Sequence, residues 1–401
     1  MQTGDHRLLK NINERLVLNL VRLNRIISSS DLVRITGMQP STIFNILRDL
    51  TENAHVLNLG KGDSTEKGGK KPYLWGLNKD ASYAIGIDIE IGQLTTVILD
   101  FSSEIVSKKV KKIEKYETLD ELVDHIVKTV NEIIGETHIA SDKILGIGIA
   151  VAGIVNSDSG IVVMTDILPE INVPFLEAVR KVFDFSVFVE NNANASVVGE
   201  KWIGVAKESK NCLNVLVEFD KGVSGLGIGF LVNEELYRGS SYSAGEINIA
   251  MPDLHEVLLN VRTHLADGSI LKKYDASTQD LEIDIMIDAA KQGDEVALSF
   301  FARLGNQIGK NISRVVAAFN PDTLILSGDV AEVGDLIVAP VKSVIDLDLL
   351  SVSSEALKIV TSTQGHYSVA IGAASLVLSD YFKVPNVRLV NGGEEADGDS
   401  D

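Results

Sequence analysis

The chain has 401 residues, of which 45% are hydrophobic and 23% charged. This composition is typical of a globular protein of two or three domains, and it excludes a wholly disordered chain and a disulfide-rich scaffold. The single cysteine, Cys212, allows neither an internal disulfide nor a cysteine-rich zinc site. The first residues lack the apolar core of a signal peptide, and no apolar run reaches the roughly 18 residues of a membrane span. We therefore expect a soluble cytoplasmic protein with no membrane partner.

The net charge of −19 is unevenly distributed along the chain. Residues 1–80 hold 12 Lys and Arg against 8 Asp and Glu, which gives a net charge of +4, and the remainder carries −23. A basic segment joined to an acidic body is typical of a DNA-binding domain attached to a body that DNA phosphates repel. A chance fluctuation of surface charge gives the same counts, so the motifs have to decide between the two interpretations.

The first 78 residues read as three helices followed by a hairpin. The expected helices and strands occupy, in order, 8–24, 30–35, 40–54, 55–59 and 73–77. Ser30 and Asp31 are expected to cap the second helix, and Pro40 stands near the start of the third, where proline is tolerated. The loop 60–72 contains no apolar residue and is expected to be exposed. This order predicts an α+β winged helix-turn-helix domain over residues 1–78.

The third helix and the hairpin loop supply the residue types that DNA recognition requires. A recognition helix enters the major groove, about 12 Å wide, with small or polar side chains at its leading end. The glycines of a wing let its backbone approach DNA, and its lysines neutralise phosphate. The expected DNA-binding residues are Gln39, Ser41, Thr42, Asn45 and Arg48 on the helix, and Lys67, Gly68, Gly69, Lys70 and Lys71 in the wing.

One such domain covers one half-site, so a dimer on a near-palindromic operator is the geometric expectation. The alternative is a three-helix dimerisation or protein-docking module whose lysine loop is merely solvated.

Beyond this domain, strands alternate with helices, which predicts α/β layers over residues 79–390. Gly305 and Gly309 are expected to interrupt a long helix over 294–319. The acidic end of the chain, 391–401, contains few apolar residues and is expected to be a disordered tail.

The body carries several motifs that are weak singly but specific in their order and spacing. They are GIDI at 86–89, VAGIV at 151–155, VENNAN at 189–194, GLGIG at 225–229, LYRGSSYSAGEI at 236–247 and NPDTLILSG at 320–328. Together with TGMQPSTI and GGKKPYLWGLN near the start, they make nearly the whole chain resemble the ROK family, which groups bacterial repressors of the xylose-repressor type with sugar kinases. The resemblance implies a body with the actin-like ATPase fold, in which two α/β lobes surround a cleft.

Three stretches depart from the kinase pattern of that family. Kinase members carry an aspartate general base in E-N-D-x-N, whereas this chain has Asn192, an amide that cannot accept a proton near neutral pH. Glu90 and Ile91 replace the two glycines of the first phosphate loop, and Asp329 adds a carboxylate where a nucleotide would lie. We therefore expect no kinase activity, no catalytic residue and no cofactor.

The zinc module of the family is missing as well. Ile249 stands at the position of its histidine, and no cysteine follows, so the thiolate and imidazole ligands of zinc are both absent. His255 is expected to be a surface or packing residue, and no metal is expected at this module.

The resemblance also implies a set of sugar-binding residues, namely Gly153, Asp166, Asn191, Asn192 and Glu246. Sugar sites use short polar side chains held in fixed positions, because a polar group left unpaired costs about 1–3 kcal/mol. The alternative is structural: Asn191 and Asn194 hold a strand-to-helix turn, and Glu246 caps a helix or pairs with a base.

These features predict a sequence-specific DNA-binding transcriptional regulator, a repressor of carbohydrate-utilisation genes that a sugar or sugar derivative in the cleft relieves or modulates. We expect a homodimer or homotetramer. Binding of the effector is expected to change how far the two lobes close, and thereby the spacing of two DNA-binding domains. Two alternatives remain open. One is an ATP-dependent sugar kinase with an appended DNA-binding head, and the other is a constitutive DNA-binding protein with a purely structural body.

Overall fold

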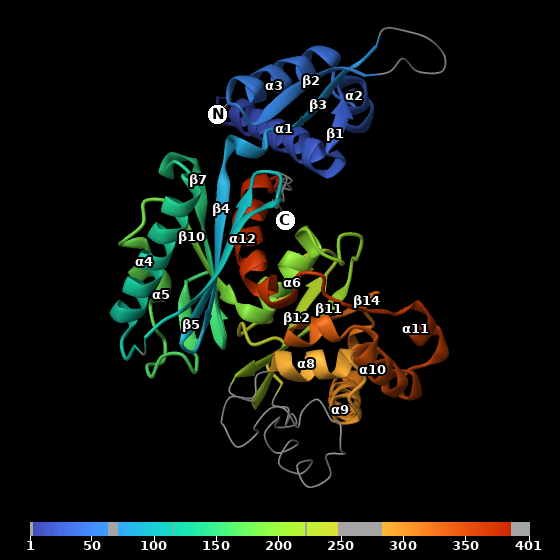
Figure 1. The fold of residues 1–401 in the computed structure, drawn as a ribbon. Coiled ribbons are helices and arrows are strands. Elements are labelled where there is room, and N and C mark those ends of the chain that lie inside the picture. Colours follow the sequence, from blue (N-terminus) through green and yellow to red (C-terminus); the bar gives the residue numbers. More distant parts are fainter. Residues whose placement is uncertain (1–2, 63–70, 115, 221–222, 248–282, 386–401) are drawn as a thin grey trace, which may run out of the picture. The chain divides into compact units, whose positions relative to one another are not determined.

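The structure is a computed structural model that describes residues 3–62, 71–114, 116–220, 223–247 and 283–385 (Figure 1). Its contacts divide the chain into two compact units. The first, called the head below, comprises Met1–Asn78 with Asp380–Asp401, and the second, called the body, comprises Lys79–Ser379. The predicted tail over 391–401 lies outside the described residues. Within the described ranges, no helix combines the length and the apolar character that a membrane crossing requires.

The head contains the three helices and the hairpin that the sequence predicts, and one further strand. Its elements are α1 (Thr3–Asn24), β1 (Ile26–Ser28), α2 (Ser29–Thr36), α3 (Pro40–Glu52), β2 (Val56–Lys61) and β3 (Tyr73–Leu77). β3 lies between β1 and β2, and both pairs are antiparallel. The sequence does not predict β1, because a strand of 3 residues is too short to show a periodic pattern.

The turn between α2 and α3 shows why each helix begins and ends where it does. The N-cap of α2 is Ser28, whose Oγ accepts a hydrogen bond from the N–H of Asp31 at 3.0 Å, so the prediction of a cap at Ser30 and Asp31 is wrong. Gly37 ends α2 with a φ of 69°, a conformation that costs glycine little. Pro40 is the first residue of α3, where its missing N–H leaves no hydrogen bond unmade.

The core of the head draws on both ends of the chain. The apolar stripe predicted on α3 is buried and consists of Ile43, Ile46, Leu47 and Leu50. The hydroxyl of Tyr381 lies 2.9 Å from Nε2 of His55, and the guanidinium of Arg15 lies 4.4 Å from the centre of the Tyr381 ring. The guanidinium of Arg22 lies 5.5 Å from the centre of the Phe382 ring. Residues near the C-terminal end therefore complete a unit that begins the chain.

The first lobe of the body is built on a five-stranded sheet with the order β10-β7-β4-β5-β6. β4, β7 and β10 run parallel, and β5 and β6 are antiparallel additions. The lobe consists of β4 (Tyr83–Glu90), β5 (Gln93–Asp100), β6 (Ile105–Lys112), α4 (Leu119–Thr137), β7 (Ile144–Val151), β8 (Ile154–Asn156), β9 (Ile161–Met164), α5 (Phe175–Arg180) and β10 (Ser186–Asn191). One face of the sheet packs against α4 and α5 in a single apolar cluster.

The second lobe is built on a sheet with the order β13-β12-β11-β14-β15, in which β11, β14 and β15 run parallel. It follows α6 (Asn192–Trp202) and consists of β11 (Cys212–Asp220), β12 (Val223–Val232), β13 (Glu235–Leu236), α8 (Ile283–Lys291), α9 (Glu295–Phe319), β14 (Thr323–Gly328), α10 (Asp335–Asp348), α11 (Ser351–Ala356) and β15 (Lys358–Thr361). The helices α8, α9 and α10 share one apolar cluster with β11 and β14. The last helix, α12, comprises Ser368–Phe382.

The helix α9 is continuous, which corrects the prediction that Gly305 and Gly309 interrupt it. These glycines instead allow α10 to approach α9 closely. A Cβ on Gly305 would lie 2.6 Å from Cγ of Pro340, and a Cβ on Gly309 would lie 2.8 Å from Cβ of Val344.

Small residues also place α12 directly on the first sheet. A Cβ on Gly86 of β4 would lie 1.9 Å from the carbonyl oxygen of Ala370, and one on Gly148 of β7 would lie 1.9 Å from that of Ala373. The isoleucines that alternate with Gly86 along β4 face the opposite, α4 side of the sheet. This packing fixes β4 and β7, whose ends support the functional site.

Replacing Gly148 by alanine is expected to lower the thermal unfolding midpoint of the protein by several degrees. The added methyl group overlaps the backbone of α12, and overpacking costs about 1–3 kcal/mol, with each kcal/mol worth roughly 2–4 °C in domains of about 200 residues. The matched control is Gly135→Ala on α4, where no atom lies within 4 Å of the new Cβ. Circular dichroism melting measures both, and equal midpoints would show that α12 does not approach β7 this closely.

Candidate functional site

The turn from β10 to α6 brings together three of the predicted sugar-binding residues. Asn191 is the N-cap of α6, and its Oδ1 accepts a hydrogen bond from the N–H of Asn194 at 3.0 Å. Its Nδ2 donates to the carbonyl oxygen of Gly153 at 2.8 Å and to Oε1 of Glu246 at 3.4 Å. The structural role that the sequence suggests for Asn191 is therefore confirmed. The side-chain amide of Asn191 thus contacts both Gly153 and Glu246.

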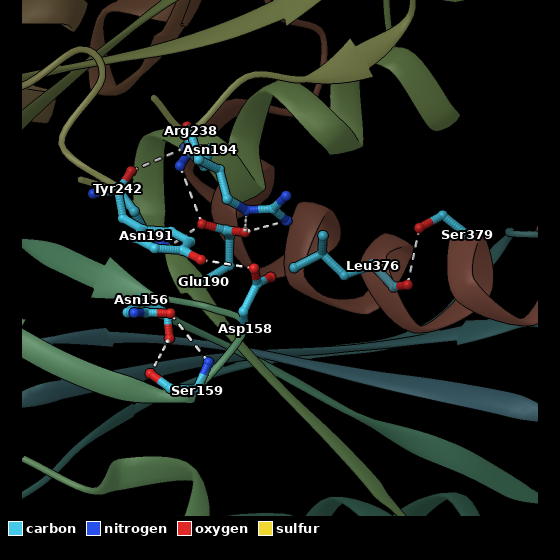
Figure 2. Close-up of polar contacts among 10 residues, drawn as sticks. All are labelled: Asn156, Asp158, Ser159, Glu190, Asn191, Asn194, Arg238, Tyr242, Leu376 and Ser379. Carbon is cyan, nitrogen blue, oxygen red and sulfur yellow. Dashed lines mark hydrogen bonds and ion pairs between the residues drawn. The ribbon is translucent and has the colours of Figure 1, made fainter. Parts of the chain in front are cut away.

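A buried ion pair ties this turn to the loop that carries Glu246 (Figure 2). Glu190 is 1% exposed, and its Oε2 accepts a hydrogen bond from Nε of Arg238 at 2.8 Å and forms an ion pair with Nη2 of Arg238 at 2.7 Å. Its Oε1 accepts from the N–H of Asn191 at 3.0 Å and from Nδ2 of Asn194 at 3.1 Å. Both oxygens of this buried carboxylate are thus engaged. The sequence motif contains Arg238, but the sequence alone does not identify its partner.

The loop 237–247 has a second attachment further along. The hydroxyl of Tyr242 donates a hydrogen bond to Oδ2 of Asp158 at 2.7 Å, as Figure 2 shows. Gly245 has a φ of 91°, and a Cβ there would lie 1.9 Å from the carbonyl oxygen of Ile228 on β12. The backbone at Gly245 therefore lies directly against β12, and the next residue, Glu246, is exposed and lies beside Asn191.

The other two predicted sugar-binding residues are placed differently. The side chain of Asn192 has other partners: its Nδ2 donates to Oε2 of Glu218 at 2.9 Å, and its Oδ1 accepts from the N–H of Ala193 at 2.9 Å. Asp166 is exposed and makes no hydrogen bond or ion pair with any residue that the structure describes. The predicted zinc-module positions, Ile249 and His255, lie outside the described residues.

Carboxylates gather beside Asn192, as the substitutions in the phosphate loops suggest. Carboxylate oxygens of Asp88, Glu90 and Glu218 lie within 4.8 Å of one another. Asp329 lies close by and accepts a hydrogen bond from the N–H of Phe219 at 2.8 Å. The sequence predicts acidic groups at Glu90 and Asp329, but it gives no signal for Glu218, which belongs to no recognised motif.

The electrostatics of this cluster disfavour a phosphate ligand. Burial raises the pKa of Asp88 well above its ordinary value, and the charges of Glu218, Glu90 and Asp329 raise it further. Burial and the charges of Glu90 and Asp329 also raise the pKa of Glu218, to about 8. His366, with Nδ1 3.7 Å from Oδ1 of Asp329, has a raised pKa because of that pairing. A nucleotide phosphate would add further negative charge here, so the position does not suit ATP.

The polar residues predicted to contact DNA lie on the outer surface of α3. Gln39, Ser41, Asn45 and Arg48 are exposed, and Thr42 is partly exposed. In the predicted wing, Lys71 is exposed, while Lys67, Gly68, Gly69 and Lys70 lie outside the described residues.

Two features of this surface differ from a simple basic recognition helix. The guanidinium of Arg48 lies 2.9 Å from Oδ1 of Asp49 and 3.7 Å from Oε1 of Glu52, so its charge is shared within α3. The apolar side chain of Phe44 lies among these polar residues and is 66% exposed. The sequence pattern gives no signal for this exposure.

The stability of the body is expected to fall as the pH rises from about 4.5 to about 8. Asp88 and Glu218 have higher pKa values in the folded than in the unfolded chain, so the folded state holds protons that the unfolded state has already lost. Each ionisation in this range therefore destabilises the fold. Glu218→Gln removes one titration and is expected to raise the melting temperature at pH 8 and to flatten the profile.

Calorimetric melting in EDTA-containing buffers across this pH range measures the effect. Glu208→Gln, at an exposed position of the body, serves as the matched control and is expected to melt like the parent. Parallel pH profiles of Glu218→Gln and the parent would contradict a raised pKa for Glu218.

Comparisons with known proteins agree with this geometry. The chain is 27% identical to the xylose repressor of Caldicellulosiruptor bescii, over 95% of this chain and 99% of the relative. A crystal structure of a ROK family transcriptional regulator, a homologue of the Escherichia coli MLC protein, matches 94% of this chain and 98% of its own, with a TM-score of 0.73 and 20% identity.

A ROK family glucokinase from Streptomyces griseus, in complex with glucose and AMPPNP, matches 74% of this chain and 99% of its own, with a TM-score of 0.62 and 22% identity. These likenesses confirm the predicted actin-like kinase fold of the body. The family model described as ROK family matches residues 84–380, most of the chain. The protein therefore belongs to the ROK family.

Proposed function

We propose that this protein is a sugar-responsive transcriptional repressor without kinase activity. The observation that carries the proposal is the hydrogen bond from Asn192 to Glu218. An amide that donates to a carboxylate stands where a sugar kinase of this family needs a proton acceptor. The full-length similarity to a xylose repressor supports the same function, since it includes both the head and the body. The function requires the compartment that holds the DNA, and we infer that this is the cytoplasm.

We interpret the head as a winged helix-turn-helix domain. In this interpretation α2, the turn at Gly37 and α3 form the helix-turn-helix, and the hairpin of β2 and β3 forms the wing. The exposed side chains of Ser41 and Asn45 can contact base edges in the major groove, and Phe44 suits the methyl group of thymine. Lys71 and the other wing lysines neutralise phosphate. A homodimer or homotetramer would place two heads on a near-palindromic operator.

The sugar site consists of Glu246, Asn191 and the carbonyl side of the Gly153 turn. Glu246 is exposed, and its described contact with Asn191 is long, at 3.4 Å, so its carboxylate can accept hydrogen bonds from sugar hydroxyls. The anchors at Arg238 and Tyr242 hold the loop in place before the ligand arrives. D-xylose is the first candidate for the bound sugar, because the chain is similar to a xylose repressor over 95% of its length. Sugar and operator then weaken each other's binding by the same factor.

Asn45→Ala is expected to weaken operator binding by about 1–3 kcal/mol, or roughly 5–150-fold in Kd, because one pair of base contacts is lost. The operator is first obtained by repeated selection from random duplexes with the parent protein. Binding is then measured by fluorescence anisotropy. Asn11→Ala, an exposed asparagine on α1, is the matched control and is expected to bind like the parent. Equal affinities of the two variants would exclude α3 as the recognition helix.

A sugar that binds the body is expected to raise the melting temperature and to release the operator. At 100 times its dissociation constant a ligand adds about 2.7 kcal/mol of stability. Glu246→Gln is expected to weaken the sugar by about tenfold through the loss of charge-assisted hydrogen bonds, without changing operator affinity in the absence of sugar. Glu235→Gln, exposed on β13, is the matched control.

The panel of sugars begins with D-xylose and continues through other pentoses and hexoses. A sugar that binds yet leaves operator affinity unchanged would overturn the switching mechanism. Steady, sugar-dependent release of ADP from ATP would overturn the absence of kinase activity.

A further inference from the structure

Three acidic side chains, which come from the two sheets of the body, have carboxylate oxygens that lie close together. Asp88 and Glu90 lie at the end of β4 in the first sheet, and Glu218 lies on β11 in the second. One carboxylate oxygen of each lies within 4.8 Å of the others. Amides orient two of them, because Nε2 of Gln93 donates to Oε2 of Glu90 at 2.6 Å and Nδ2 of Asn192 donates to Oε2 of Glu218 at 2.9 Å.

Asp88 distinguishes this cluster from an ordinary acidic surface. The residue is 3% exposed, and no residue that the structure describes donates a hydrogen bond to its carboxylate or forms an ion pair with it. The charged groups that act on it are the carboxylates of Glu218, Glu90 and Asp329. A buried carboxylate without a donor is costly, and it lies among the oxygens that would complete a cation site.

The nearby histidine offsets only part of the negative charge of this cluster. His366 has its Nδ1 3.7 Å from Oδ1 of Asp329, and its Nε2 lies 3.5 Å from Oγ1 of Thr95. The pKa of His366 is raised first by Asp329 and also by Glu90 and Glu218, so its single charge is shared among these carboxylates and cannot balance all of them.

We propose that Asp88, Glu90 and Glu218 bind one hard divalent cation, Mg²⁺, Mn²⁺ or Ca²⁺, directly and without a nucleotide. Carboxylate oxygens are the ligands that these ions prefer, and water can fill the remaining coordination positions. The site lacks the thiolate and imidazole ligands that favour zinc. Gln93 and Asn192 act as positioning residues, since each holds one ligand carboxylate through a neutral amide.

This site connects the two lobes. Two of its ligands extend from β4 and the third extends from β11, so the ion binds only when the two sheets have the spacing described here. Metal binding therefore stabilises this arrangement of the lobes.

The test uses the full-length chain, freed of metal with EDTA and then exchanged into chelator-free buffer. Mn²⁺ alone is titrated and followed by electron paramagnetic resonance, with saturation expected at one ion per chain. Glu218→Gln and Glu90→Gln are each expected to weaken Mn²⁺ binding by about tenfold or more. The exposed control Glu208→Gln is expected to bind like the parent. Competition with Mg²⁺ and with Ca²⁺ then identifies the preferred ion.

Melting curves provide a second readout that checks folding. Without metal, Glu218→Gln is expected to melt above the parent, because the substitution relieves repulsion between carboxylates. With Mn²⁺ the parent is expected to gain stability and the variant is not. Unchanged binding in both Glu90→Gln and Glu218→Gln would overturn the proposal. So would the absence of saturable Mn²⁺ binding up to about 1 mM, the affinity of the weakest protein calcium sites.

Discussion

The ion pair between Glu190 and Arg238 determines how the binding side of the body is organised. A carboxylate as buried as Glu190 requires a charged partner, and removing that partner typically costs about 3–5 kcal/mol. Arg238 supplies it from a loop that is distant in sequence, and this loop carries Glu246. The remaining oxygen of Glu190 holds the turn of Asn191 and Asn194. One buried charge thus fixes both the turn and the loop relative to each other.

The amide at Asn192 and the acidic groups beside it are physically connected. An aspartate in place of Asn192 would face Glu218 at hydrogen-bonding distance and repel it, whereas the amide donates a hydrogen bond to it. Asn192 therefore lets Glu218 exist beside Asp88 and Glu90. This set of residues is poorly suited to bind a phosphate, because its acidic groups supply no positive charge and already raise one another's pKa values. The body has the kinase fold, and the charge of this cluster disfavours a phosphate ligand.

The elements that the sequence predicts are those with long periodic patterns or local capping signals. The helix α3, the hairpin of β2 and β3, and the turn at Asn191 all depend on neighbouring residues, and the structure has each of them. The strand β1 is too short to give a pattern, and the close approach of α10 at Gly305 depends on a partner that the local sequence does not reveal.

The same division applies to the site. Resemblance to the family identifies Gly153, Asn191 and Glu246, which the fold brings together. It does not identify Glu218 as the partner of Asn192, because Glu218 approaches β4 only through the packing of two sheets. The anchoring role of Arg238 is hidden for the same reason: ion pairs between distant segments leave no local signal.

The head is formed by two segments that lie far apart in the sequence, and this has a consequence for protein synthesis. Residues 1–78 leave the ribosome before the body does, whereas Tyr381 and Phe382, which pack against Arg15, His55 and Arg22, follow the body. The head therefore acquires its final packing contacts only after the whole body has been translated. A chain that ends before these aromatic rings therefore has a head whose core packing is incomplete.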